Sequence, residues 1–239
     1  MRKLLLVLLF VFFSSYANTD PLLVVTELSP PDQILVNGEV AGKGTELIRA
    51  IFAKANLTPN IQMYPWARAF RLATMTENTF IYTIARTKER ENNFYWIGPV
   101  SHFELAFVAL KERDDIIINN TEEAKKYKIA MQRNDFSTDI LTNLGFEVVL
   151  TTDIQKSYAL LVAKKVDLIV DDPELINQIS QYLPTPNAEF KAIYNIEELK
   201  VDAYLAANKH TDIHYINALQ QAFYELKHNK DNLKKTTVP

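Results

Sequence analysis

The sequence predicts an α/β protein built from two similar halves. Short runs rich in β-branched and aromatic residues alternate with amphipathic segments of helical period, first over residues 22–97 and again over residues 105–182. Strands that alternate with helices favour parallel strands covered by helices. The chain has 239 residues, of which 48% are hydrophobic, so it can bury a sizeable core in one or two domains.

The first 17 residues have the features of a secretory signal peptide. The cations Arg2-Lys3 precede an apolar run over residues 4–13, and Ser15-Tyr16-Ala17 is a small-x-small cleavage site. Ten apolar residues are too few to span a bilayer as a helix. We therefore expect cleavage after Ala17, a mature chain of 222 residues in a periplasm, and no stable insertion into the membrane.

Charge and cysteine content exclude several functions. The chain has a formal net charge of −3, and loss of the signal peptide, with two cations and no acid, makes it −5. This sign disfavours nucleic-acid binding, which needs clustered Lys and Arg. The absence of cysteine excludes disulfides, thiolate metal sites and a lipid-modified cysteine after the signal peptide. We expect a monomer without metal or other cofactor.

In the first half, the Asn37-Gly38 pair suits a type I′ hairpin turn, Thr45 suits the N-cap of one helix, and Pro65 suits the first turn of another. We expect strands at 22–26, 60–63, 79–84 and 94–97, a hairpin over 34–40, and helices at 45–55 and 65–75.

In the second half, Gly145 marks the end of one helix. We expect strands at 105–110, 128–131, 147–150 and 166–170, and helices at 121–126, 137–144, 153–164 and 173–182. Strands at 190–194 and 201–206 and a helix at 212–228 complete the chain, with Ile213, Ile216, Leu219, Phe223 and Leu226 on the buried stripe of that helix.

Cations follow the buried strand at 79–84. Arg86, Lys88 and Arg90 lie in the polar turn at its carboxyl end, which is where ligands bind in open α/β sheets. A guanidinium there can hold a carboxylate through two parallel hydrogen bonds. Arg90 is therefore a candidate anchor for a ligand carboxylate, and a solvated loop residue is the alternative interpretation.

The segment around Arg90 also resembles a known family. The pattern Thr87-Lys88-Glu89-Arg90, followed by Phe94 and by Trp96-Ile97-Gly98-Pro99, resembles the T-x-E-R…F-S-x-P-Y signature of the family 3 periplasmic solute-binding proteins. These are the polar amino-acid binding proteins of bacterial uptake systems. The resemblance implies that Arg90 holds the ligand α-carboxylate. Thr83 stands where the family usually has Gly, and Ala85 where it usually has a ligand-binding Thr, which leaves the ligand class open.

The resemblance implies a type II periplasmic-binding-protein fold, with two α/β lobes joined by a two-crossing hinge. Residues 22–103 and 201–239 would form lobe 1, and residues 104–200 would form lobe 2. The crossings would lie near residues 100–104 and 198–202, and the terminal helix would pack back on lobe 1. A small-molecule ligand and an ABC transporter permease are the partners that the resemblance implies.

Further site candidates follow other strands. Trp66 can stack on a ligand or pack between helix and sheet, and Tyr64 has a weaker case. Gln132, Arg133 and Ser137 lie in a loop before a helix amino terminus, where free N–H groups favour an anion.

The segment over residues 166–172 resembles the V-D-A-V-x-x-D segment of the family, whose last acid contacts the ligand amino group. Asp172 takes that place in this chain. Since Pro173 follows it, Asp172 is also a good helix N-cap, and one carboxylate can serve both roles.

Hydrolytic motifs are missing from the sequence. The pair His210-x-x-x-His214 lacks the Glu of a metalloprotease motif, and there is no G-x-S-x-G. Three hypotheses remain: a binding protein that feeds a transporter, a sensor on the same fold, and an enzyme resembling the dehydratase of prephenate-like acids, for which Asp171 or Asp172 could supply a proton.

Overall fold

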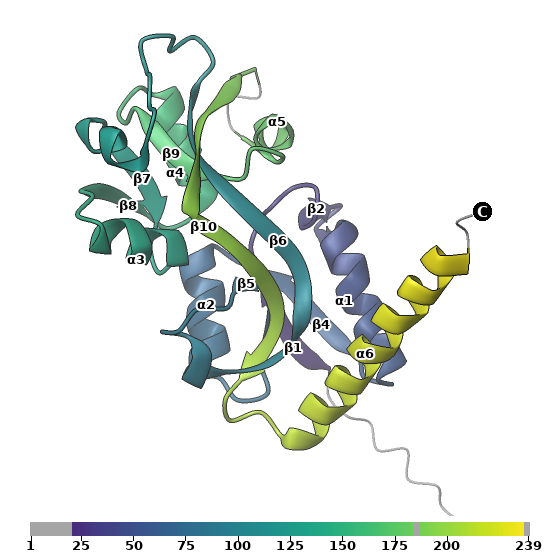
Figure 1. The fold of residues 1–239 in the computed structure, drawn as a ribbon. Coiled ribbons are helices and arrows are strands. Elements are labelled where there is room, and N and C mark those ends of the chain that lie inside the picture. Colours follow the sequence, from purple (N-terminus) through teal and green to yellow (C-terminus); the bar gives the residue numbers. More distant parts are fainter. Residues whose placement is uncertain (1–20, 184–186, 237–239) are drawn as a thin grey trace, which may run out of the picture.

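A computed structural model describes residues 21–183 and 187–236 (Figure 1). The predicted signal peptide, residues 1–17, lies outside the described residues. The fold is α/β, as predicted, and a single eight-stranded mixed sheet runs through both halves in the order β4-β1-β5-β10-β6-β9-β7-β8. No helix within the described ranges is long and apolar enough to cross a membrane.

One half of the molecule is organised around β1 (Leu22–Thr26), and we call it the β1 half. This strand lies between β4 (Pro59–Met63) and β5 (Phe80–Ala85) and is parallel to both. The helices α1 (Lys43–Lys54) and α2 (Trp66–Met75) connect these strands.

A small hairpin of β2 (Ile34–Val36) and β3 (Glu39–Ala41) precedes α1. Asn37 and Gly38 both have positive φ, at 53° and 84°, as the type I′ turn requires.

The other half repeats this plan around β7 (Ile129–Gln132), and we call it the β7 half. This strand is parallel to β8 (Val148–Thr151) and β9 (Leu168–Asp171). The remaining elements of this half are η2 (Thr121–Lys126), α3 (Phe136–Asn143), α4 (Ile154–Val162), α5 (Ile176–Ile179) and η3 (Ser180–Tyr182). The single helix expected at 173–182 is thus a turn followed by two short helical segments.

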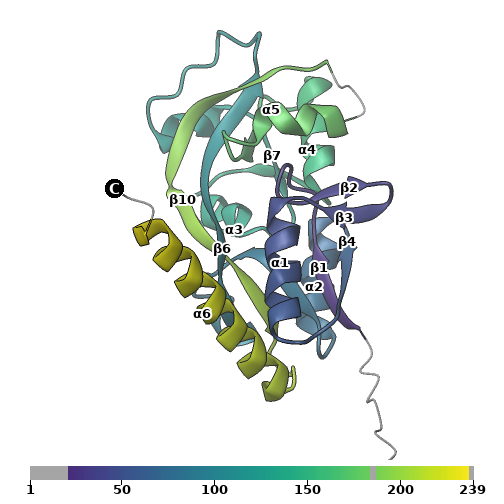
Figure 2. The same cartoon turned by 90° about the vertical axis from the view of Figure 1, so that its right-hand side faces the viewer.

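Two long antiparallel strands connect the halves. The strands β6 (Phe94–Leu110) and β10 (Phe190–Asn208) run side by side through the molecule, as Figure 2 shows. We predicted each as two short strands separated by a crossing. Pairing continues through the crossings, where His102 lies opposite Asp202 and Glu104 opposite Lys200, because each backbone supplies the hydrogen-bond partners of the other.

The last helix, α6 (Ile213–Thr236), packs against α1 and β6 (Figure 1). Its residues Ile216, Leu219 and Ala222 belong to the hydrophobic core that also contains Val24, Ile48 and Phe80. The predicted stripe is correct except at Ile213, which is 54% exposed in the first turn of the helix.

Gly98 in β6 determines how closely α6 approaches the sheet. A Cβ at this position would overlap three ring carbons of Phe223. We expect Gly98→Ala to lower the free energy of unfolding by about 1–3 kcal/mol, as overpacking does. Urea denaturation of the variant would measure this change. The double variant Gly98→Ala with Phe223→Leu should recover part of the loss, and an undiminished effect would show that the ring is not its cause.

Candidate ligand-binding cleft

The cleft lies where the carboxyl ends of parallel strands from the two halves face each other. Glu27 follows β1 and Ala85 ends β5, whereas Gln132 ends β7 and Asp171 ends β9. Loops at the carboxyl ends of strands are the usual ligand site of an open α/β sheet. Three adjoining cavities open here, and Glu27 lines all of them.

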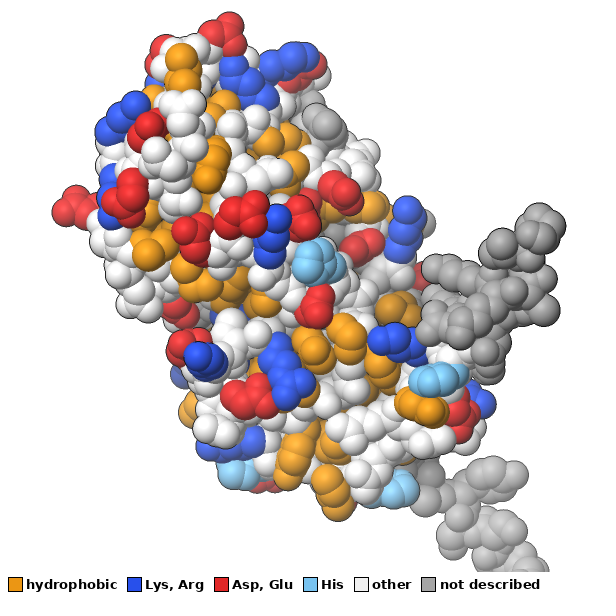
Figure 3. Space-filling view, viewed as in Figure 1, with side chains coloured by type: hydrophobic (Ala, Val, Ile, Leu, Met, Phe, Trp, Pro, Cys, Tyr) orange, Lys and Arg blue, Asp and Glu red, His pale blue; other side chains and the backbone are white. Residues whose placement is uncertain are grey.

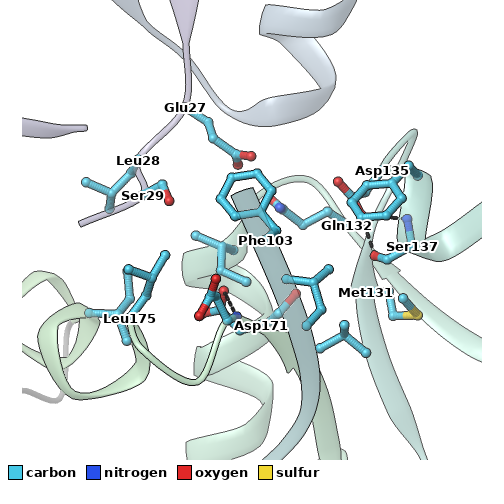
Figure 4. A pocket seen from close by; sticks show the side chains of 17 residues that line it. Glu27, Leu28, Ser29, Phe103, Met131, Gln132, Asp135, Ser137, Asp171 and Leu175 are labelled. Atoms are coloured by element: carbon cyan, nitrogen blue, oxygen red, sulfur yellow. Dashed lines mark hydrogen bonds between the residues drawn. The ribbon is translucent and has the colours of Figure 1, made fainter. Parts of the chain in front are cut away.

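The first of these cavities is acidic. It encloses about 720 Å³ including its open mouth, and the carboxylates of Glu27, Asp135, Asp171 and Asp172 line it. Figure 4 shows Glu27 reaching toward the cavity from the segment after β1, with Asp171 on the opposite side. We call this the acidic cavity.

The second cavity lies beside it and contains the predicted anchor. Its lining includes Trp66, Thr83, Ala85 and Arg90, together with Glu27 and Asp135 from the shared wall. We call this the arginine cavity. The third cavity opens near the hairpin of the β1 half, and its lining includes Tyr64 and Asp153.

Arg90 is almost completely buried, with 4% of its surface exposed. Its Nη1 donates to the carbonyl of Ala85 at 3.3 Å, and its Nη2 donates to the carbonyl of Asn134 at 2.8 Å. The guanidinium also lies over the rings of Phe70 and Trp66, at 4.9 and 5.6 Å from their centroids. Burial lowers the pKa of Arg90, and the charges of Asp135 and Asp139 oppose this effect.

The carbonyl of Asn134 joins the two halves across the cleft. It accepts hydrogen bonds from Arg90 and from Nε1 of Trp66, the latter at 3.0 Å. Both donors belong to the β1 half, whereas Asn134 lies between β7 and α3. Trp66 itself is 3% exposed and packs against Phe70, so it lines the cavity and is also a core residue.

The loop before α3 differs from the expected anion site. Gln132 and Ser137 line the acidic cavity, but Arg133 is exposed and lines none of the three cavities. Asp135 is the N-cap of α3, and its carboxylate accepts from the Ser137 backbone N–H at 2.9 Å and from the Ser137 hydroxyl. The carboxylate of Asp135 therefore already occupies the helix amino terminus, where we expected an anionic ligand.

Asp172 has the predicted capping geometry and also lines the acidic cavity. Its carboxylate accepts from the backbone N–H of Glu174 at 2.9 Å, and 8% of the residue is exposed. Burial is the main reason that the pKa of Asp172 is raised.

Thr83 and Ala85 form part of the wall of the arginine cavity. Thr83 has a φ of 59°, a left-handed conformation that is unfavourable for a β-branched residue and natural for glycine. Its hydroxyl donates to the carbonyl of Tyr82 at 2.6 Å and so is directed at its own backbone. The local conformation explains why Gly is the expected residue at this place.

The sequence analysis missed Glu27 and Asp135 as parts of the cleft, and it considered Asp171 only as a proton donor of an enzyme. Burial and the charges of Asp135 and Asp171 raise the pKa of Glu27 well above its usual range, while a hydrogen bond from the Gln132 side chain lowers it. Glu27 comes directly after the strand predicted at 22–26, so the strand-end argument that selected Arg90 would also have selected Glu27.

Asp171 lies at the back of the acidic cavity. Its carboxylate accepts from the Tyr158 hydroxyl at 2.7 Å and from the Asp172 backbone N–H at 2.9 Å. Burial is the main cause that raises the pKa of Asp171 to about 6. Among the described residues, no three His, Cys, Asp or Glu side chains are grouped in a way that could hold a metal ion.

Comparisons with known proteins support the fold. No protein-family model matches the chain, and no curated protein sequence matches it. Among solved structures, a histidine kinase sensor domain with similarity to periplasmic binding proteins has a TM-score of 0.76 at 18% identity, covering 89% of this chain and 92% of that one.

Two further structures have similar scores. The arginine-, lysine-, histidine-binding protein ArtJ from Geobacillus stearothermophilus has a TM-score of 0.76 at 15% identity, with 88% and 91% coverage of this chain and that chain. The GluR0 ligand-binding core from Nostoc punctiforme, in complex with L-glutamate, has a TM-score of 0.70 at 20% identity, with 88% and 94% coverage. At these identities, the similarity shows a periplasmic-binding-protein-like fold.

The raised pKa of Asp171 predicts how stability depends on pH. In the folded state Asp171 keeps its proton up to about pH 6, whereas the ordinary pKa of an Asp side chain is 3.8. Ionisation of Asp171 therefore costs stability as the pH rises through this window. We expect Asp171→Asn to raise the free energy of unfolding at pH 7.5 by at most about 3 kcal/mol, at 1.36 kcal/mol per pH unit.

Urea denaturation at pH 4 and pH 7.5 measures this difference. An amide can accept from the Asp172 N–H and donate to the Tyr158 oxygen, so the variant should fold. The gain should vanish near pH 4, where the wild-type carboxyl is protonated. A gain of the same size at both values would mean that charge at Asp171 is not responsible.

Proposed function

We propose that the protein is a solute-binding protein of the family 3 type, which captures a small polar solute in the cleft and delivers it to an ABC-type transporter in the membrane. The observation that carries the proposal is the convergence of strand ends from two α/β halves on one set of adjoining cavities. A site built from both halves can respond to a ligand by closure about the connecting strands.

The moving units in this proposal are residues 22–103 with 201–239 and residues 104–200. Among the described strands and helices, only β6 and β10 cross between them, and a change in their twist near His102 and Asp202 would open or close the cleft. Ligand contacts made to both units at once would favour the closed arrangement.

Arg90 would hold a ligand carboxylate in this mechanism. Its Nη2 now donates to the carbonyl of Asn134, which a ligand carboxylate could replace with a charge-assisted bond. Asp172 would contact the ligand from the opposite unit, and the ring of Trp66 would contact it as an aromatic wall. Several solved structures of similar fold are named as arginine-binding or amino-acid-binding proteins, which supports a solute of this size and polarity.

A sensor role on the same fold is the second candidate, since one of the similar structures is a histidine kinase sensor domain. A dehydratase-like enzyme is the third, because Asp171 lies in the cavity with a pKa of about 6, which suits proton transfer near neutral pH. Product formation on incubation with prephenate-like acids would identify an enzyme. Release of solute to a reconstituted permease would separate transport from sensing.

A thermal-shift screen against amino acids, oligoamines and organic acids tests the proposal directly. A solute that binds only the folded state raises the melting temperature in proportion to the logarithm of its concentration. We expect at least one class to do so at millimolar concentration. A flat response to every class would contradict a solute-binding function.

For a solute found in this way that carries a carboxylate, we expect Arg90→Ala to weaken binding by at least about ten-fold, since a buried charge-assisted pair is lost. The variant should also lose stability without ligand, by about 1–3 kcal/mol, because the carbonyls of Ala85 and Asn134 each lose one hydrogen-bond donor. Calorimetric titration and urea denaturation measure the two effects.

Trp66→Phe is the matched control for this variant. It removes the other hydrogen bond to the Asn134 carbonyl but no charge. If Trp66→Phe weakened binding as much as Arg90→Ala, Arg90 would act through the contact between the halves and not as the carboxylate anchor.

A further inference from the structure

The charged side chains that line the cleft are mostly acidic. Among the described residues that line the three cavities, five are carboxylates, Glu27, Asp135, Asp153, Asp171 and Asp172, and one is a cation, Arg90. Over the face seen in Figure 3, by contrast, acidic and basic side chains are interspersed, and pairs such as Lys54 with Glu225 are typical of the surface. A cleft lined by one sign of charge attracts ligands of the other sign.

The single cation lies at one end of the cleft. Arg90 is in the arginine cavity and is not part of the lining of the acidic cavity, which contains four carboxylates and no Lys, Arg or His. Glu27 and Asp135 form the boundary between the two cavities. The acidic cavity therefore has excess negative charge that Arg90 can balance only in part.

Two hydroxyl groups in or beside the acidic cavity donate to its carboxylates, whereas the Ser157 hydroxyl, also in the lining, is paired with the hydroxyl of Thr151. The Ser137 hydroxyl donates to Asp135, and the Tyr158 hydroxyl donates to Asp171. The Gln132 amide interacts with Glu27 through a hydrogen bond, while its buried Oε1 has no hydrogen-bond partner among the residues that the structure describes. The cavity thus offers acceptors to a ligand, and ammonium and guanidinium groups, which donate and do not accept, match this arrangement.

The walls between the carboxylates are apolar. Phe103 from β6, Phe136 from α3 and Leu175 from the turn before α5 line the acidic cavity with the acids. Such walls pack against an aliphatic chain while the polar groups hold its end. Figure 4 shows Phe103 lying between Glu27 and the side of the cavity formed by Gln132 and Asp135.

We propose that the acidic cavity binds the cationic end group, an ammonium or a guanidinium, of an aliphatic solute, and that Glu27 is its anchor. This assignment rests on the proposed solute-binding function and specifies the chemical class of the solute. The carboxylate of Glu27 pairs with the cation, Gln132 Oε1 and Asp135 accept further hydrogen bonds, and the aliphatic chain lies against Phe103. The opposite end of the solute points toward the arginine cavity.

Calorimetric titration with pairs of solutes that differ in charge and little in shape tests the assignment. The pairs are L-arginine with L-citrulline and L-lysine with L-norleucine, and agmatine, L-glutamate and calcium chloride are further probes. We expect the cationic member of at least one pair to bind, and its neutral partner to bind at least about ten-fold more weakly. Agmatine, which has no carboxylate, should bind independently of Arg90 if the cation is the main anchor.

The variant Glu27→Gln keeps the shape and removes the charge. It should weaken binding of the cationic solute at least about ten-fold and leave binding of its neutral partner nearly unchanged. Since burial already disfavours the ionised form of Glu27 and raises its pKa, we expect the variant to fold. Glu27→Asp, which keeps the charge, should bind better than Glu27→Gln.

Glu147→Gln is the control for the loss of one charge from the whole protein, because Glu147 is exposed and lies outside the three cavities. It should bind like the wild type. Tight binding of only neutral or anionic solutes would overturn the assignment of a cationic solute and leave the proposed solute-binding function intact. Calcium binding that depends on Glu27 would have the same consequence. If no solute of any charge bound, the proposed function itself would fail together with the assignment.

Discussion

Backbone pairing between β6 and β10 holds both halves of the molecule in one sheet. The pairing continues from Phe94 opposite Asn208 to Leu110 opposite Phe190, with register shifts on the way. Since every other strand belongs to one half, this pair determines which strand ends face each other across the cleft. The shifts between Asn195 and Lys200 show where the ladder is least regular, and irregular pairing lets strands bend and twist.

The chemistry of the cleft follows from this topology. Parallel strands in each half direct their carboxyl ends to the same edge, so residues that follow β1 and β5 meet residues that follow β7 and β9. Glu27, Asp135 and the neighbouring pair Asp171 and Asp172 meet here although these three places are far apart in the sequence. Burial keeps the pKa of Glu27 and of Asp171 above its usual value. Functional sites characteristically tolerate such unfavourable electrostatics, because a ligand of opposite charge relieves them.

Much of the fold could be predicted from the sequence because hydrophobic periodicity and turn residues act locally. The hairpin at Asn37-Gly38 and the strand ending at Ala85 are examples. The continuity of β6 through Ser101 and His102 could not be predicted, since these polar residues owe their extended conformation to pairing with β10, about a hundred residues away.

The candidate site was predicted in part for a similar reason. Arg90, Trp66, Gln132 and Ser137 were found because they follow strands or resemble family positions, and all of them line the cleft. Their partners could not be found, because the contacts of Arg90 and Trp66 with the Asn134 carbonyl depend on how the two halves meet. Arg133 was chosen because it lies in the loop before a helix amino terminus, and local sequence does not reveal that its side chain is exposed.

Solute binding in the proposed function depends on closure of the two halves around a solute held between them. Small-angle X-ray scattering of the mature chain, with and without a saturating solute, tests this most directly, because it reports the separation of the halves and no single contact. We expect a smaller radius of gyration in the presence of solute, since contacts made to both halves favour the closed arrangement. Identical scattering with and without a solute shown to bind would contradict closure and would place the binding site within one half.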